Sequence, residues 1–243
     1  MEWLKEAMEY VVGMKKPEII EACGHTYSDK ALVMLDEEKE NYASYIELST
    51  LSSLIDYIGS CVDAMKGKQI IHVVSPTAVD MFSVLDKNRK RENLIRVRAV
   101  VPEYSFGYFL DKETFTIAVQ SKFLPTEDRD IILRFSGTVE KGTVTSYGDD
   151  GVSQKATVKT GISSKSDALI PNPVTLKPYR TFIEVDQPES DFVFRMKDSG
   201  DVKCALFEAD GGAWKNEAME NVADYIRDGL ERIGKDEDFI VIY

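Results

Sequence analysis

The sequence predicts an α+β fold in which helices pack on an antiparallel β-sheet, and three observations lead to this expectation. The chain has 243 residues, of which 43% are hydrophobic and 10% aromatic, so it is too apolar for a disordered chain and can bury a core. Residues 138–243 alternate apolar and polar side chains between turn signals, which is typical of antiparallel strands. Two segments, 49–65 and 215–233, space their apolar residues as amphipathic helices do.

The first half of the chain is predicted to mix helices and strands. Residues 2–13 carry the apolar stripe of a short amphipathic helix, and Ser49 is a suitable N-cap for the helix that follows it. A run rich in β-branched residues, too short for a helix, predicts a buried strand at 69–75. Further strands are expected at 78–85 and 94–101.

Segment 111–123 fits two patterns, because its apolar residues match both helical spacing and strand alternation. Asp111 favours the helix, since its carboxylate can cap the helix N-terminus. A second helix is expected to begin at Thr126 and to end at Gly137, with acidic residues in its first turn where the helix dipole favours them.

The second half is predicted to be a series of strands that a helix and a last strand complete. An Asp-Gly pair at Asp150 and Gly151 separates two alternating segments and predicts a β-hairpin, because glycine tolerates positive φ. A boundary near Gly137 divides the chain into 1–137 and 138–243, which form either two domains or one continuous domain. The elements expected after the hairpin are strands at 182–186, 192–196 and 202–207, a helix at 215–233 and a strand at 239–243.

Charge and cysteine content limit the function classes. The net charge of −12 repels a nucleic-acid backbone, so any contact with DNA or RNA has to come from a local cluster of cations. Three widely spaced cysteines, Cys23, Cys61 and Cys204, do not suit a disulfide framework and fit a reducing compartment. We also find no signal-peptide pattern and no apolar run long enough for a membrane span. The expected location is therefore the cytoplasm, without membrane contact.

Catalytic motifs are missing from the sequence. It contains no phosphate-binding glycine loop, no nucleophile elbow and no zinc-protease motif. Cys23 and His25 supply two metal ligands at most, and His72 reads as a half-buried strand residue. Paired acids can hold Mg²⁺, but acids in turns usually serve the turn itself, so we expect no metal and no cofactor. The acid pairs are Asp149 with Asp150, Glu208 with Asp210, and Asp128 with Asp130.

Two basic islands are the strongest binding candidates. Residues 87–98 carry a local net charge of +5, and residues 155–180 carry +4, within a chain that is otherwise strongly acidic. Such segregation of charge attracts an anionic ligand. Tyr179 and Phe182 can stack a base, while Lys177 and Arg180 beside them hold a phosphate. The alternative is a solvated strand face whose aromatic residues point into the core. The candidate ligand-binding residues are Arg89, Lys90, Arg91, Arg96, Arg98, Lys155, Lys159, Lys177, Tyr179 and Arg180.

Self-association is predicted from an aromatic segment. Residues 104–109 hold four aromatic side chains in six positions, and proline-edged strands and segregated charges add further contact surfaces. We therefore expect a homo-oligomer.

Four segments of the second half carry a resemblance to a known family: 148–154, 171–182, 187–195 and 205–214. On these segments the chain resembles a phage and prophage family of unknown function, the YfdQ-like family. The resemblance covers roughly residues 138–243, and the first half is similar only in outline, with a helix at 49–65 before the strand at 70–76. It implies a virus-encoded protein of the host cell cytoplasm, made early, among phage replication and recombination functions. No catalytic residue is assigned in the family, so none is carried over.

Together these observations predict a phage-encoded, non-enzymatic accessory protein that self-associates and binds nucleic acid or a nucleotide in early phage DNA metabolism. One alternative is an anti-defence protein that binds a host protein or sequesters a nucleotide signal. A second alternative is a metal-dependent hydrolase that uses Asp149, Asp150, Glu208 or Asp210.

Overall fold

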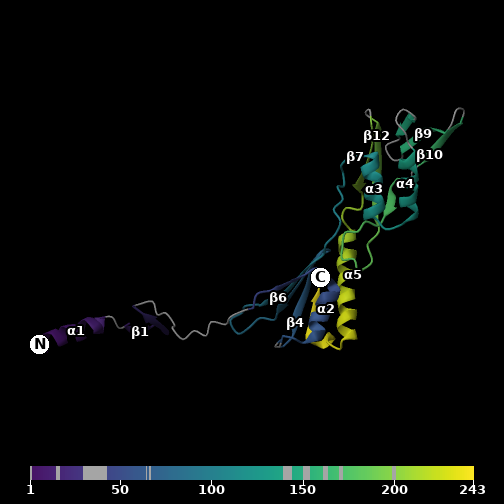
Figure 1. The fold of residues 1–243 in the computed structure, drawn as a ribbon. Coiled ribbons are helices and arrows are strands. Elements are labelled where there is room, and N and C mark those ends of the chain that lie inside the picture. Colours follow the sequence, from purple (N-terminus) through teal and green to yellow (C-terminus); the bar gives the residue numbers. More distant parts are fainter. Residues whose placement is uncertain are drawn as a thin grey trace. The chain divides into compact units, whose positions relative to one another are not determined.

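The computed structural model describes residues 2–14, 17–29, 43–63, 65, 67–138, 144–149, 154–160, 164–169, 172–198 and 201–243 (Figure 1). Contacts along the chain divide it into two compact units, Met1–Tyr42 and Ala43–Tyr243. The fold class is α+β, as the sequence predicts. Among the helices of the described residues, none has both the length and the apolar composition that a membrane span requires.

The first unit contains a helix and a hairpin. Helix α1 spans Glu2–Met14 and confirms the predicted amphipathic helix. Strands β1 (Ile19–Ala22) and β2 (His25–Ser28) pair antiparallel across Cys23 and Gly24. Both turn residues have positive φ, 54° and 79°, as a two-residue hairpin with a primed turn requires.

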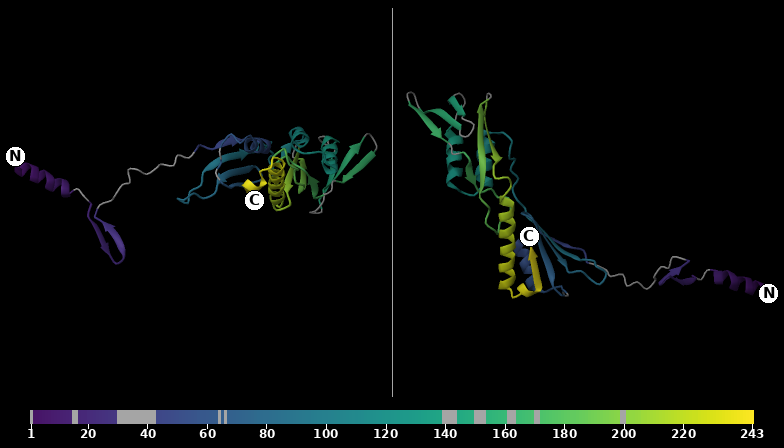
Figure 2. Two further views of the ribbon diagram at one scale, coloured as in Figure 1. Left: turned by 90° about the horizontal axis from the view of Figure 1, so that it is seen from below. Right: turned by 180° about the vertical axis from the view of Figure 1, so that it is seen from behind.

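The second unit contains a five-stranded sheet with the strand order β14-β4-β5-β6-β3. The three central strands are antiparallel, but β14 pairs parallel with β4 and β3 pairs parallel with β6, so the sheet is mixed. In Figure 1 and Figure 2 the yellow C-terminal strand lies beside the blue strands from the first half of the chain. The bounds are β3 Ile46–Leu48, β4 Gln69–Ser75, β5 Ala78–Ser83, β6 Asn93–Arg98 and β14 Phe239–Ile242.

Helices α2 (Leu51–Ser60) and α5 (Trp214–Arg232) pack on one face of the five-stranded sheet. Every second residue of the central strands points to these helices, as the two-residue period of a strand dictates. The buried residues of this core include Leu54, Ile58, Ile71, Val73, Val79, Met81, Ile95, Val97, Val222 and Ile226.

Both helices were expected on a sheet built from residues 138–243, and that placement is wrong. They cover strands β4, β5 and β6 of the first half, because their apolar stripes share one core with those strands. Helix α2 is also shorter than 49–65. Thr50 caps it by accepting a hydrogen bond from the amide of Ser53, and Cys61 ends it in the left-handed conformation with φ 50°.

A four-stranded antiparallel sheet, ordered β11-β12-β13-β7, forms the second core. Its strands are β7 (Leu110–Asp111), β11 (Val174–Leu176), β12 (Ser190–Asp198) and β13 (Val202–Glu208). Helices α3 (Lys112–Lys122) and α4 (Glu127–Thr138) pack on it. The helix predicted at 111–123 is confirmed, and Asp111 caps it by accepting from the amide of Thr114 at 2.9 Å. The buried residues of this second core include Phe115, Val119, Phe123, Ile132, Phe135, Phe192, Phe194 and Leu206.

A third sheet consists of three antiparallel strands in the order β10-β9-β8. Strands β8 (Val144–Asp149) and β9 (Gln154–Thr160) pair as the predicted hairpin, and β10 (Ser164–Leu169) pairs with β9. The turn residues Asp150 and Gly151 lie outside the described residues. Each of the two larger cores contains residues from both sides of Gly137. Helix α3 packs with β12 in one core, and β4 packs with α5 in the other.

Two segments differ from their predictions. Residues 182–186 form a turn rather than a strand, because Phe182 and Val185 pack into the core under α2 and α5 from an irregular loop. The aromatic segment 104–109 is largely internal. Tyr104 and Phe106 pack against the core of the four-stranded sheet, and only Tyr108 is strongly exposed, at 70%. The segment therefore does not offer the aromatic surface from which self-association was predicted.

Substitution of Gly229 tests how closely α5 approaches α2. A Cβ at this position would lie 2.8 Å from two carbon atoms of Ile55, so we expect Gly229→Ala to lower the free energy of unfolding by about 1–3 kcal/mol. Gly59→Ala is the matched control, because its Cβ would meet Ile233 at an ordinary 3.7 Å. Alanine should raise stability there by about 0.5–1 kcal/mol through helix propensity. Urea unfolding of both variants measures the two effects, and equal stabilities would contradict the packing.

Thiol labelling tests the burial of Cys204. This residue is 0% exposed in β13, and burial raises the pKa of its thiol to about 12. Cys23 and Cys61 are exposed free thiols. An aromatic disulfide reagent should therefore label Cys23 and Cys61 in the folded protein and Cys204 only after unfolding. Rapid labelling of Cys204 under native conditions would show that β13 is not packed as described.

Candidate nucleic-acid interface

The face of the five-stranded sheet opposite α2 and α5 is solvent-accessible within the second unit. Strand register places one residue from each strand in a single row across this face. Exposed fractions of 46% at Val74, 43% at Ile240 and 44% at Ile242 show that no other element of this unit covers them fully. We call this surface the open face. One row of register partners across it consists of Ile242, His72, Asp80, Arg96 and Glu47. A neighbouring row consists of Ile240, Ile70 and Phe82.

A basic hairpin loop, residues 84–92, extends from this sheet between β5 and β6. Its two acids are held by backbone amides: Asp86 accepts from Lys90 at 2.7 Å, and Glu92 accepts from Ala43 at 2.8 Å. Arg89 has a positive φ of 59°, and the side chains of Arg89, Lys90 and Arg91 are exposed. The loop therefore turns its carboxylates to backbone donors and its cations to solvent.

Two cations of this region stack on aromatic rings. The guanidinium of Arg91 lies 5.5 Å from the centre of the Phe82 ring and donates a hydrogen bond to the carbonyl of Ser83. The guanidinium of Arg96 lies 3.9 Å from the centre of the Tyr45 ring. Stacking of this kind fixes a guanidinium without neutralising it, so its charge remains available to an anion.

Arg98 behaves differently, because it forms an ion pair with Asp80 at 2.7 Å across β5 and β6. It also donates to the carbonyls of Val79 and Val97. Its charge therefore offsets that of Asp80.

The second predicted island lies on other elements, and those of its side chains that the structure describes do not form one exposed cluster. Lys155 and Lys159 lie in β9, where only the backbone is described. Lys177 forms an ion pair with Glu189 at 3.3 Å, and Tyr179 is half-buried. Phe182, which was expected to help stack a base, is 1% exposed and belongs to the core. The described part of this island thus matches the alternative that its aromatic residues serve packing.

Arg180 is 8% exposed, and its ion-pair partner Glu208 has a side chain that is 41% exposed. It donates to Glu208 at 2.8 Å and to the hydroxyl of Ser190, and its guanidinium lies 3.8 Å from the centre of the Trp214 ring. Burial lowers the pKa of Arg180 to about 10, while the charges of Glu208 and Asp210 limit that fall. These contacts link β12, β13 and the start of α5 to the loop that carries Arg180.

The same loop connects the two large cores. Leu176 lies in the core of the four-stranded sheet, whereas Phe182 lies in the core under α2 and α5. Between them, the hydroxyl of Thr181 donates to the carbonyl of Pro76, and the carboxamide of Gln187 accepts from the amides of Arg180 and Thr181. Arg180 therefore serves the joint between the cores.

The predicted metal ligands are also used elsewhere. Burial opposes the charged form of Asp210, but hydrogen bonds from Gly212 and Ser190 and the charge of Arg180 hold its pKa below the usual range. Asp128 accepts from the amide of Thr175 at 2.7 Å. The side chain of Asp149 and all of Asp150 lie outside the described residues. In the part of the chain that the structure describes, no three His, Cys, Asp or Glu side chains are grouped as a metal site would need.

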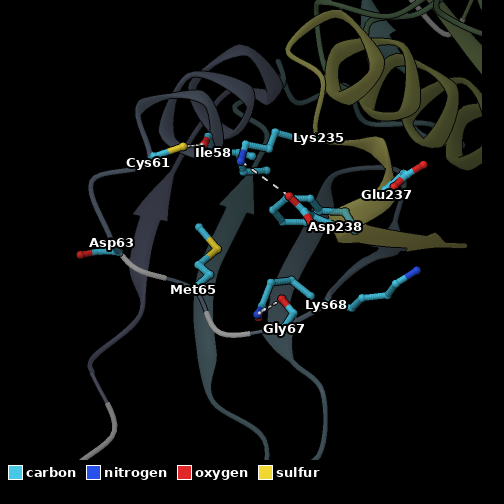
Figure 3. A pocket seen from close by; sticks show the side chains of 11 residues that line it. Ile58, Cys61, Asp63, Met65, Gly67, Lys68, Lys235, Glu237 and Asp238 are labelled. Carbon is cyan, nitrogen blue, oxygen red and sulfur yellow. Dashed lines mark hydrogen bonds and ion pairs between the residues drawn. The ribbon is translucent and has the colours of Figure 1, made fainter.

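A pocket of about 760 Å³ opens between the end of α2 and the start of β14 (Figure 3). It was not predicted, because it forms only when segments 58–69 and 235–239 meet. Lys68 and Lys235 face it together with three acids, and Lys235 lies 3.6 Å from Asp238. This mixed lining gives no preference for an anion. The acids are Asp63, Glu237 and Asp238.

Replacement of Arg180 tests its structural role. Lysine cannot reach two acceptors in a fixed fork and stack on Trp214 at the same time, so Arg180→Lys should lower the free energy of unfolding by about 2–4 kcal/mol. Glu189→Gln is the control, since it breaks an exposed ion pair that contributes at most about 1 kcal/mol. Urea unfolding compares the two. A loss below that of the control would show that Arg180 does not stabilise the joint.

No family model matches the sequence, no curated protein is similar to it, and no solved structure matches the fold. The resemblance of residues 138–243 to the YfdQ-like family therefore stays a prediction. Function has to follow from the geometry of the chain's own residues.

Proposed function

We propose that the protein binds nucleic acid through the basic hairpin loop and the adjoining arginines of the open face. One observation carries the proposal: the acids of the loop are engaged by backbone amides, while Arg89, Lys90 and Arg91 are exposed. A local cationic surface is what a protein of net charge −12 needs in order to approach a phosphate backbone.

The cations follow a segment of chain rather than surrounding one point. The loop cations precede β6 directly, and Arg96 stands on β6 with its guanidinium on Tyr45. An extended row of this kind suits a chain of phosphates better than a single nucleotide, which a closed pocket would hold. The proposal therefore favours a polymer over the mononucleotide that the sequence also allowed.

The biological setting that we propose is early phage DNA metabolism, in an accessory protein. This setting rests on the resemblance of residues 138–243 to the YfdQ-like family. It is independent of the loop geometry, so the binding experiment below tests the loop alone.

Charge reversal of the loop tests the proposal. The triple variant Arg89→Glu, Lys90→Glu, Arg91→Glu should lose most of the affinity for an oligonucleotide of about 20 nucleotides, measured by fluorescence anisotropy. Each phosphate contact contributes about 0.9 to the slope of log affinity against log salt for a duplex and about 0.7 for a single strand, so the slope should fall by about 2 to 3 between roughly 50 and 200 mM salt.

A matched triple variant controls for net charge. Lys68→Glu, Lys215→Glu, Arg232→Glu reverses three exposed cations outside the loop, and both variants lower the net charge from −12 to −18. The control should retain most of the affinity of the natural chain and its salt slope. The proposal is wrong if the natural chain shows no salt-dependent binding or if the two variants lose affinity equally.

A further inference from the structure

We infer that the open face binds single-stranded nucleic acid, with unpaired bases stacked on its aromatic and guanidinium groups while the basic hairpin loop holds the backbone. The inference rests on the proposed function and deepens it by naming the form of nucleic acid. Three aromatic side chains define the stacking positions: Tyr45, His72 and Phe82.

Aromatic rings and cations lie together on this face. His72 on β4 and Phe82 on β5 meet edge to face, with ring centres 6.4 Å apart. Arg91 covers the Phe82 ring, and Arg96 covers the Tyr45 ring, which is 40% exposed. A guanidinium that stacks on a ring can present its other plane to a base, and aromatic and arginine planes are the usual partners of unstacked bases.

The spacing of these groups suits successive bases. Neighbouring strands lie about 4.8 Å apart, so side chains on β4, β5 and β6 form stacking positions in sequence across the sheet. Each stacked base contacts one such position through its π-face, whatever its identity. The inferred binding is therefore tolerant of base sequence.

A duplex cannot use these positions. Its bases are stacked on one another and show only their edges in the grooves, where an α-helix or a two-stranded ribbon fits. The open face has five strands and is about 19 Å wide, as strand spacing gives, which is wider than a major groove of about 12 Å. A single strand can spread its bases on such a surface.

The acids of the open face do not make it repel a polyanion. Asp80 is paired with Arg98 at 2.7 Å, and Glu47 is the register partner of Arg96 on the neighbouring strand. These four charges balance in number, and the cations of the basic hairpin loop come in addition to them. The charge of the surface is therefore complementary to a phosphate backbone. It disfavours a symmetric dimer through this face, because the loop cations of one copy would meet the same cations of the other.

The decisive experiment compares one oligonucleotide in two forms. The natural chain should bind an unlabelled thymidine oligomer of about 20 nucleotides at least ten-fold more tightly than the duplex of the same length, in competition against a fluorescent strand. Phe82→Leu and Tyr45→Leu keep apolar volume but remove the ring. Each should weaken single-strand binding at least about five-fold and leave the salt slope unchanged.

Two controls keep the result interpretable. Tyr108→Leu removes an exposed aromatic outside the open face and should not alter affinity. Urea unfolding checks that each variant is folded; if Phe82→Leu is unstable, Tyr45→Leu alone gives the answer, since Tyr45 is exposed.

The outcomes separate the two proposals. Equal or tighter duplex binding that still depends on the loop cations would overturn the single-strand inference and leave the proposed function standing. Binding of neither form would overturn both. If the natural chain dimerises and Phe82→Leu abolishes the dimer without changing strand affinity, the open face belongs to a second copy, and the inference is wrong.

Discussion

Two helices cover only one face of a five-stranded sheet, and most of the molecule's chemistry follows from this arrangement. Alternation along β4, β5 and β6 sends Ile71, Val79 and Val97 into the core under α2 and α5. The same alternation sends His72, Phe82 and Arg96 to the other side. A shift of register by one residue would bury His72 and Arg96 and expose the core, so the face that packs and the face that we propose to bind are fixed together.

Charges in the second unit have two different roles. Arg180 is buried among Glu208, Ser190 and Trp214, where it holds the loop that joins the two cores. Arg89 and Lys90 have no such role, because their loop is ordered by Asp86 through backbone hydrogen bonds. Cations that a count of charges treats alike therefore stabilise the fold at one place and are exposed at the other, where we propose recognition. The backbone of each segment, more than its composition, decides between the roles.

Local signals in the sequence predicted those elements that depend on nearby residues. Asp111 identified the start of α3, and β-branched composition identified β4, since caps and strand preference act over a few positions. The turn at 182–186 was predicted as a strand, because the sequence does not show that Phe182 packs against core residues far away along the chain. The parallel pairing of β14 with β4 and the helix-covered side of the sheet were missed for the same reason.

The candidate site was predicted in part. The cluster 87–98 was identified from charge, and its cations lie on one hairpin. The burial of Arg180 and the pairing of Lys177 could not be foreseen, because a count of lysines and arginines does not show which acids fold beside them. Tyr45, His72 and Phe82 come from three segments, and only strand register brings them to one surface.

Photo-crosslinking tests the central claim most directly. A single strand that carries 4-thiothymine is bound to the full chain and irradiated, and crosslinked peptides are identified by mass spectrometry. The account predicts crosslinks to the peptides of β4 and β5 that contain His72 and Phe82, and to the segment that contains Tyr45. Crosslinks confined to the four-stranded sheet or to α5 would contradict it.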